Sequence, residues 1–313
     1  MSGLVHGFVL DGQGGARRIA ADADVAGVRW LHFDYTHAET ATWLERQVPE
    51  RVAGALLTME TRPRVTALDD GVLVYLRGVN LNPGEQPEDM IAIRLWLRGN
   101  QVYSTQRRSL AAVRSLQESF EQGEGPRSAG ELLASLIDRL TWNLEEVIEA
   151  IEDQVAVFDR PGDASSRQTR ARLAALRRRA IILRRYLNPQ REAIIGLQAD
   201  ASGLLSDSDK VTVREAGDRL QRLLEDLDSA REQATLAQEA MNAVLSDQLN
   251  QRMYLLAILT GIFLPASFLT GLFGINVAGM PGTDDPRAFG YFAGAVSLVM
   301  VVVAIIMWRK RWL

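Results

Sequence analysis

Two long apolar runs near the C-terminus dominate the hydropathy pattern of this chain. The first, Met253 to Ile275, belongs to an uncharged stretch that continues to Thr283, and the second spans Ala288 to Trp308. As helices they would be about 34 Å and about 32 Å long at 1.5 Å per residue, which matches the ~30 Å hydrocarbon thickness of a bilayer. The pattern therefore predicts two transmembrane helices joined by a loop, 276–287, that is rich in Gly and Pro.

The first hundred residues instead alternate over short segments, as β-strands with intervening helices do. Strands are predicted at 4–10, 30–35, 64–68, 72–80, 90–98 and 102–105, with a tight turn at Gly99-Asn100. The glycines of segment 11–15 are interpreted as a hairpin turn and not a phosphate loop, because 16–19 continues as a returning strand. Thr36 is the predicted N-cap of a helix over 38–48.

From Ser109 onward the pattern is helical. A first helix is predicted over 109–122, and the spacing of Ser128 and Glu131 indicates a capping box that opens an acidic helix reaching about Phe158. The next helix, about 165–199, is rich in arginine. Such a basic run can bind nucleic acid or anionic lipid. We favour the interpretation that the acidic and basic helices lie antiparallel and compensate each other's charge.

The following helix, predicted from about Val211 to Phe273, carries a seam of apolar or small residues at alternating steps of three and four, typical of a coiled coil. Its members are Leu220, Leu223, Leu227, Ala230, Ala234, Ala237, Met241 and Val244. A helix of about 90 Å at 1.5 Å per residue needs partners along such a seam. The simplest partners are copies of the same chain.

The same steps continue into the first apolar run as a polar or small stripe. Its members are Asn250, Met253, Ala257, Thr260, Leu264, Ser267, Gly271 and Gly274. Two interpretations stay open from the residues alone: close helix packing, or the lining of a water-filled pore in a ring of subunits. Pro265 is expected to loosen or bend this span without ending it. The second run suits lipid contact.

The composition limits which metal sites, catalytic groups and partners this chain could have. The 313-residue chain has a formal net charge of −4 and no cysteine, which excludes disulfides and thiolate metal sites. His32 and His37, with Asp34 and Glu39 nearby, raise the hypothesis of a zinc site; we favour ordinary solvated or strand-face histidines. We find no nucleophile with a plausible base and no supported cofactor motif, and so predict neither an enzyme nor a cofactor. The acidic body argues against nucleic acid as a partner.

The ends of the chain predict an orientation. Met1 to Leu10 lacks the pattern of a cleaved signal peptide, and the basic tail Arg309-Lys310-Arg311 should remain inside. With two spans, both termini are then expected in the cytoplasm and the loop outside.

At this point the residues resemble a known family. The run from Met253-Tyr254-Leu255 through Leu264-Pro265 to Gly274-Ile275-Asn276 is similar to the first membrane helix and GxN signature of CorA-type divalent cation transporters. In place of the Tyr-Gly-Met-Asn typical of the magnesium branch, this chain has Phe273-Gly274-Ile275-Asn276 without an acidic continuation, which resembles the ZntB zinc-transporting branch. The resemblance covers the whole plan of the chain and is most specific over 250–282.

The resemblance implies a homopentamer in a bilayer whose first spans line a pore for divalent cations. It places the selectivity filter at Gly274, Ile275 and Asn276. The pore-lining set that it implies is Asn250, Met253, Leu256, Thr260, Leu264, Ser267 and Gly271. Here Leu256 comes from the family match, whereas spacing alone preferred Ala257.

The filter also has a physical rationale. A ring of neutral amides can accept hydrogen bonds from the water around a hydrated cation without trapping it. Asp284 and Asp285, repeated in an oligomer, would concentrate cations at the outer mouth. No permanent metal coordination is expected, because the pore contains no His, Cys, Asp or Glu.

The expected fold is an α+β cytoplasmic domain with a mixed sheet, followed by a helical stalk and two C-terminal transmembrane helices in a CorA-like pentameric funnel. The predicted segments are 1–125 (α/β domain), 126–252 (helical hairpin and stalk), 253–275 (pore-lining helix), 276–287 (periplasmic loop), 288–308 (second span) and 309–313 (basic tail). The expected function is proton-coupled zinc uptake across the bacterial inner membrane, with cadmium, nickel and cobalt as further cargo. The alternatives are a CorA-type magnesium/cobalt channel and a membrane-anchored coiled-coil scaffold.

Overall fold

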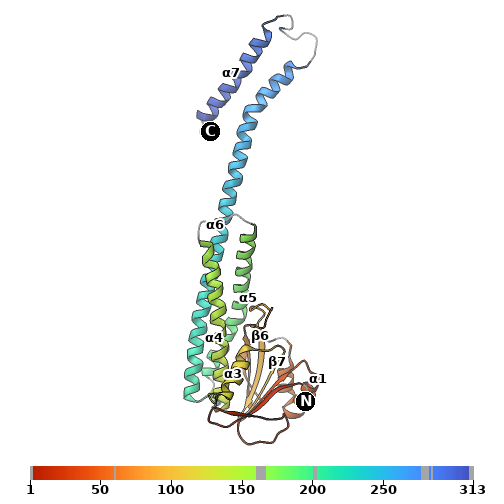
Figure 1. The fold of residues 1–313 in the computed structure, drawn as a ribbon, viewed down its shortest axis with the longest axis vertical. Coiled ribbons are helices and arrows are strands. Elements are labelled where there is room, and N and C mark those ends of the chain that lie inside the picture. Colours follow the sequence, from red (N-terminus) through yellow and green to blue (C-terminus); the bar gives the residue numbers. More distant parts are fainter. Residues whose placement is uncertain are drawn as a thin grey trace. The chain divides into compact units, whose positions relative to one another are not determined.

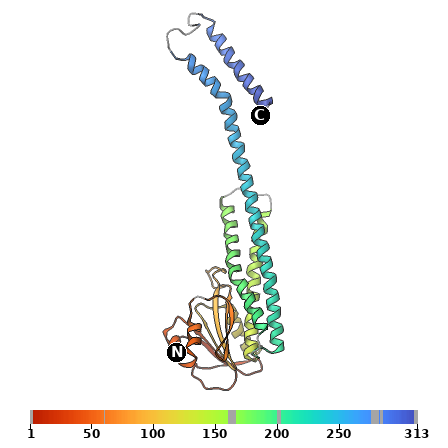
Figure 2. The same ribbon diagram turned by 180° about the vertical axis from the view of Figure 1, so that it is seen from behind.

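The computed structural model describes residues 3–59, 61–159, 167–199, 203–275, 282 and 285–309, which divide into two units, 1–238 and 239–313. Figures 1 and 2 show the chain from opposite sides. The first unit contains a seven-stranded mixed sheet and a group of helices. The second contains the end of one long helix and the helix that follows it. The mixed α+β plan with two candidate C-terminal spans is the predicted one.

The sheet has the strand order β2-β1-β3-β7-β6-β5-β4. Its strands are β1 (Leu4–Leu10), β2 (Ala16–Arg18), β3 (Arg29–Asp34), β4 (Arg64–Leu68), β5 (Gly71–Gly78), β6 (Ile91–Arg98) and β7 (Gln101–Gln106). All neighbours are antiparallel except β3 and β7, which are parallel. The segment 11–15 is the predicted hairpin turn: the Asp11 carboxylate accepts hydrogen bonds from the backbone N–H groups of Gln13 and Gly15, at 2.7 and 3.0 Å.

Both faces of the sheet are covered. On one face Leu31, Phe33, Tyr75 and Trp96 form a core with α1 (Ala38–Gln47) and α2 (Glu50–Leu57). The alternate residues point the other way, where the packing helices are α3 (Ala111–Glu121) and α4 (Ala129–Ala156). For example, the rings of Phe8 and Phe120 lie 5.4 Å apart on that side. This alternation is what a sheet buried on both faces requires.

Two local predictions near α1 and α2 were wrong. Thr36 does not cap α1: the residue before that helix is His37, which makes no side-chain cap bond. Instead, the Thr36 N–H and hydroxyl both donate to Asp34 Oδ1, at 2.8 and 2.7 Å, because an Asp side chain readily closes a turn two residues on. Helix α2, which begins directly after Pro49, was not predicted at all.

The remaining helices follow the predicted plan. They are η1 (Val157–Asp159), α5 (Arg167–Gln198), α6 (Asp207–Phe273) and α7 (Ala288–Arg309). The Ser128 half of the predicted capping box at α4 is confirmed, since Ser128 Oγ accepts from the Glu131 N–H at 3.0 Å. The Glu131 carboxylate instead accepts from the Arg127 N–H, at 2.7 Å. Pro265 lies inside α6, which continues beyond it as expected.

Helices α4, α5 and the first part of α6 run side by side in both views (Figures 1 and 2). Charge compensation was predicted between the acidic helix α4 and the basic helix α5, but the observed ion pairs join each of them to α6. Arg184 of α5 pairs with Asp228 of α6 at 2.7 Å, and Arg219 of α6 pairs with Asp138 of α4 at 2.8 Å. Within the described residues, no ion pair joins α4 directly to α5.

The seam of α6 is buried inside a single chain over its first part. Leu220, Leu227, Ala230 and Ala234 are each no more than 1% exposed, and α4 and α5 of the same chain lie beside this stretch. The prediction that copies of the chain pack along this seam was therefore wrong for residues 220–234. Three helices of one chain already bury the apolar positions of a coiled-coil pattern.

Candidate functional site: the C-terminal helical hairpin

Two helices of the described chain are long and apolar enough to cross a membrane, α6 and α7, and neither apolar window is buried. The end of α6 packs against α7 within the second unit. A Cβ placed on Gly261 would lie 3.6 Å from Sδ and Cε of Met307, and the rings of Phe273 and Phe292 lie 4.9 Å apart. A small residue at a helix contact is the usual means of close approach in membranes. This contact was not predicted from the sequence.

One face of α6 turns toward α7. Its half-buried residues are Ile258, Gly261, Ile262, Pro265, Ala266 and Leu269. At 100° per residue, this face lies about 155° around the helix from the predicted pore-lining face.

Every residue of the predicted pore-lining set is exposed in the single chain: Asn250, Met253, Leu256, Thr260, Leu264, Ser267 and Gly271. Ala257 is exposed as well, so burial does not choose between it and Leu256. Thr260 donates its hydroxyl to the Leu256 carbonyl at 2.8 Å, as membrane helices commonly do. The Thr260 hydroxyl is thus satisfied within the helix, and the exposure of this face shows that the described part of α7 does not cover it.

The predicted filter begins where α6 ends. The Gly274 N–H bonds back to the carbonyls of Thr270 and Gly271, at 2.9 and 3.2 Å, and Ile275 follows in a bend. Asn276, the central residue of the predicted filter, lies outside the described residues, as does Asp284.

Asp285 stands at the start of α7. Its Oδ1 accepts a hydrogen bond from the Arg287 N–H at 2.8 Å, and its carbonyl accepts from the Ala288 N–H at 3.0 Å. The residue is exposed. A carboxylate at a helix N-terminus is favourable, so Asp285 has a structural role in addition to any effect on cations.

The three histidines do not converge on one site. His32 is fully buried in β3, with Nδ1 2.6 Å from Ser104 Oγ, whereas His37 is exposed, 3.9 Å from Asp34. Among the described residues, no group of three or more His, Asp or Glu side chains is arranged to hold a metal ion.

His32 instead stacks on His6, with ring centroids 4.8 Å apart. Burial lowers the pKa of His6 to about 2 and that of His32 to about 4. Both imidazoles are therefore neutral in the native protein at ordinary pH.

Comparison with known proteins gives the family. The family model for CorA-like Mg2+ transporter proteins matches residues 25–310. The zinc transport protein ZntB of Yersinia enterocolitica is 34% identical over 319 residues, covering 100% of this chain and 97% of the relative. The divalent cation transporter CmaX of Pseudomonas aeruginosa is 39% identical over 326 residues, covering 99% and 97%.

Comparison with solved structures leads to the same family. The full-length CmaX protein superposes with a TM-score of 0.86 at 38% identity, covering 99% of this chain and 98% of CmaX. The CorA magnesium transporter of Methanocaldococcus jannaschii superposes with a TM-score of 0.83 over 99% of both chains, and at 16% identity it supports the fold alone. The chain therefore belongs to the CorA-like family.

Proposed function

We propose that this protein transports divalent metal cations across a membrane through a pore lined by α6 in a homopentamer. The observation that carries the proposal is the α6 face described above: it continues to the Gly274 turn, bears Thr260 and Ser267, and lies away from α7. Two helices cannot enclose an aqueous path, so a pore on this face requires several copies of the chain. The names of the relatives, which are transporters and not enzymes, support this class of function.

Zinc is the proposed cargo, because relatives matched over their full length are named zinc transport proteins. Cadmium, nickel and cobalt are the proposed secondary cargo, and uptake coupled to protons the proposed direction. The proposed setting is the bacterial inner membrane with both termini cytoplasmic, as the basic tail supports. The runner-up is a magnesium/cobalt channel, since CorA of M. jannaschii, with the same fold, is a magnesium transporter by name.

In the proposed mechanism, Asn276 of each subunit presents an amide oxygen to the water shell of the passing cation, with Gly274 and Ile275 forming the turn. Neutral oxygens favour a hydrated ion over a trapped one, and small divalent cations give up water reluctantly. Asp284 and Asp285 raise the local cation concentration by their charge. The exposed α6 face then provides a path with few strong ligands.

The test is flux into proteoliposomes across a panel of Zn2+, Cd2+, Ni2+, Co2+ and Mg2+, with and without a pH gradient. We expect zinc flux that the pH gradient increases and that Asn276→Ala alters. Larger Mg2+ flux than Zn2+ flux would support the runner-up. No flux of any ion would refute transport and support the membrane-anchored scaffold.

A matched pair of variants tests the assignment of the face. Thr260 and Thr270 both donate their hydroxyls to helix carbonyls, at 2.8 and 3.1 Å. Thr270 lies about 90° around the helix from the predicted pore face at 100° per residue. We expect Thr260→Val to change the zinc flux and Thr270→Val to leave it unchanged. Equal effects of the two substitutions would contradict the assignment.

A further inference from the structure

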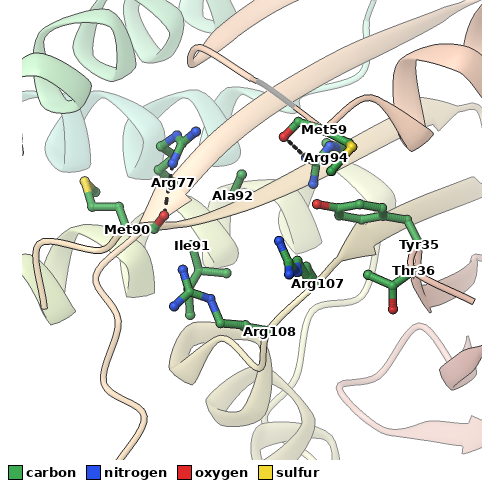
Figure 3. Close-up of a pocket in the computed structure, with 10 residues that line it drawn as sticks. All are labelled: Tyr35, Thr36, Met59, Arg77, Met90, Ile91, Ala92, Arg94, Arg107 and Arg108. Carbon is green, nitrogen blue, oxygen red and sulfur yellow. Dashed lines mark hydrogen bonds between the residues drawn. The ribbon is translucent and has the colours of Figure 1, made fainter. Parts of the chain in front are cut away.

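A basic cavity of about 710 Å³ lies in the first unit, on the sheet face covered by α1 and α2 (Figure 3). Four arginines line it, together with Tyr35 and Met59: they are Arg77, Arg94, Arg107 and Arg108. Neither the proposed pore nor the fold accounts for it. Its volume is in the range of sites for small organic ligands, about 300–1,000 Å³.

The strand register explains why the arginines gather. Tyr75 lies opposite Arg94 across β5 and β6, and Arg94 lies opposite Thr105 across β6 and β7. Since side chains alternate along a strand, Arg77 falls on the same face as Arg94. Arg107 follows β7 directly, two residues after Thr105, and lines the same cavity. The aromatic core of this face thus changes into a basic surface at one end of the sheet, just beyond the end of α2.

The cavity lies at the carboxyl ends of the two parallel strands. Tyr35 follows β3 and Arg107 follows β7, and the Tyr35 N–H donates to the Gln106 carbonyl at 3.2 Å. Ligands of sheets with parallel strands commonly bind beyond their carboxyl ends. The position is therefore suited to a small molecule.

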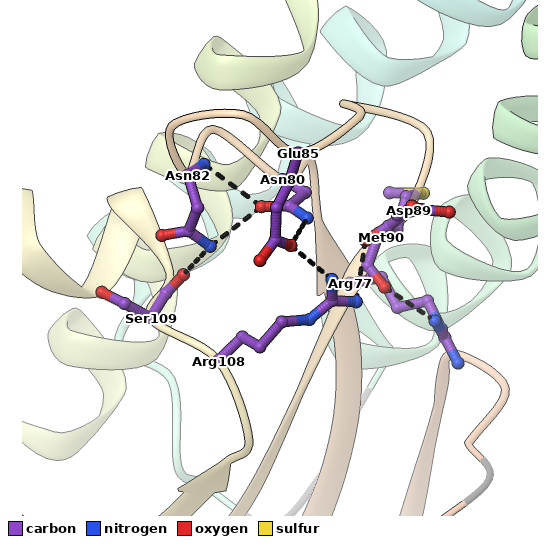
Figure 4. A network of polar contacts seen from close by, with 8 residues as sticks. All are labelled: Arg77, Asn80, Asn82, Glu85, Asp89, Met90, Arg108 and Ser109. Atoms are coloured by element: carbon purple, nitrogen blue, oxygen red, sulfur yellow. Dashed lines mark hydrogen bonds and ion pairs between the residues drawn. The ribbon is translucent and has the colours of Figure 1, made fainter.

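Two of the four arginines are already engaged. Arg108 pairs with Glu85, which Asn80 also contacts (Figure 4). Arg77 donates to the carbonyls of Thr61 and Met90, with distances of 2.9–3.3 Å, and its guanidinium lies over the Tyr186 ring. Carbonyls and a ring satisfy its donors but do not cancel its charge.

The other two arginines, Arg94 and Arg107, have fewer hydrogen-bond and ion-pair partners. Arg94 is 1% exposed and donates through one nitrogen to the Met59 carbonyl at 3.2 Å, with its guanidinium 4.4 Å from the Tyr35 ring centroid. Its Nε is buried without a hydrogen-bond partner. Arg107 is exposed and forms no ion pair with any residue that the structure describes.

Arg94 thus carries a positive charge that is buried and has no anionic partner among the described ion pairs, and the exposed Arg107 adds a second charge beside it. Burial lowers the pKa of both Arg77 and Arg94, and the nearby charge of Arg94 adds to the lowering in Arg77. Among the lining residues that the structure describes there is no Asp or Glu. A buried guanidinium donor without a partner costs free energy, and an anion that accepts from Arg94 and Arg107 would recover it.

We propose that this cavity binds a nucleotide-sized phosphorylated anion, a nucleoside diphosphate or triphosphate, with its phosphates on Arg94 and Arg107. Guanidinium groups match phosphate oxygens in geometry and charge, and several of them suit a polyphosphate better than a single small anion. Met59, Met90 and Ile91 provide an apolar wall for the organic part of the ligand. The site is separate from the proposed pore residues and does not depend on transport.

The experiment measures binding of fluorescent N-methylanthraniloyl-ADP to the full-length protein in detergent at low ionic strength, by anisotropy, with competition by ADP, ATP and inorganic pyrophosphate. We expect saturable binding, with ADP or ATP competing better than pyrophosphate because only they contact the apolar wall. Arg107→Ala should weaken ADP at least about tenfold, the effect of losing one charge-assisted hydrogen bond. Arg17→Ala, an exposed arginine of β2 outside the cavity, is the matched control.

Three results would overturn the proposal. The first is an absence of saturable binding by the native protein up to millimolar nucleotide. The second is equal weakening by Arg107→Ala and Arg17→Ala, which would mean diffuse electrostatic attraction. The third is pyrophosphate competing as well as ADP, which would mean that only an inorganic anion is held. Arg107 is exposed, so its replacement should not prevent folding.

Discussion

The stacked pair His6 and His32 should make the stability of the first unit strongly dependent on pH. His32 is completely buried and His6 is 6% exposed, and Nε2 of each imidazole is buried without a hydrogen-bond partner. Burial is the main cause that lowers the pKa of His6 to about 2 and of His32 to about 4. In the unfolded chain both would titrate near pH 6.5.

The direction follows from linkage. Below pH 6.5 the unfolded chain takes up protons that the native state does not, so the free energy of unfolding falls as pH falls. The contribution of His32 to this fall ends below about pH 4, whereas His6 continues to lower the free energy of unfolding until about pH 2. At pH 5.0, which is 1.5 units below the unfolded value, each histidine lowers the free energy of unfolding by about 2 kcal/mol at 1.36 kcal/mol per unit. The pair together gives about 4 kcal/mol.

Hydrogen exchange of the β1 and β3 amides, read by mass spectrometry at pH 7.5 and 5.0 and corrected for intrinsic rates, measures this difference. We expect the opening constant to rise roughly a thousandfold at pH 5.0, the equivalent of about 4 kcal/mol. The variants His6→Gln and His32→Asn should each remove about half of the change. His37→Gln, at an exposed position, should leave it intact. A change below about 1 kcal/mol, or one that survives both substitutions, would refute the reasoning.

Two further predictions concern packing. Leu227 is fully buried in the α6 seam, so Leu227→Ala should lower the free energy of unfolding by about 2–5 kcal/mol. The loss would be measured as a lower midpoint of thermal unfolding. Leu236→Ala, at a 59% exposed position, is the control and should change the midpoint little. Gly261→Ala should be tolerated because its Cβ would make an ordinary 3.6 Å contact with Met307. Gly261→Leu should lower the thermal midpoint in detergent. Gly290→Leu, where nothing lies within 4 Å, is the control, and an equal loss there would contradict this account of the hairpin.

Much of the sheet could be predicted from alternation alone. The bounds of β1 and β4 agree with the predicted strands, because turn residues bracket both segments. Helix α2 was missed because it is only 8 residues long and follows the end of α1 almost directly. Its signals were present, however: Pro49 before an acidic first turn, and Val52 and Leu56 on one face.

The two candidate sites, the pore face and the basic cavity, differ in whether they could be predicted from the sequence. The pore face was accessible because its steps of three and four lie within one helix, where sequence spacing fixes direction. The basic cavity was not, because Arg77 and Arg94 lie on two strands and Arg107 directly after a third, and no local pattern specifies the register of these strands. What the sequence does contain is an arginine within or directly after each of three alternating segments: Arg77 in β5, Arg94 in β6 and Arg107 after β7. That signal becomes a site only once the strands are paired.

The two halves of the α6 pattern show what periodicity can and cannot establish. The steps of three and four around Leu220 and Leu227 indicate a packed face, and the packing helices belong to the same chain. The same steps around Thr260 and Ser267 leave a face that α7 does not cover. Periodicity therefore identifies which residues meet a partner, but not whether the partner is a neighbouring helix, another subunit or water. The proposed pentamer rests on family membership and on the need to enclose a path, and only measured flux through a variant of this face tests it directly.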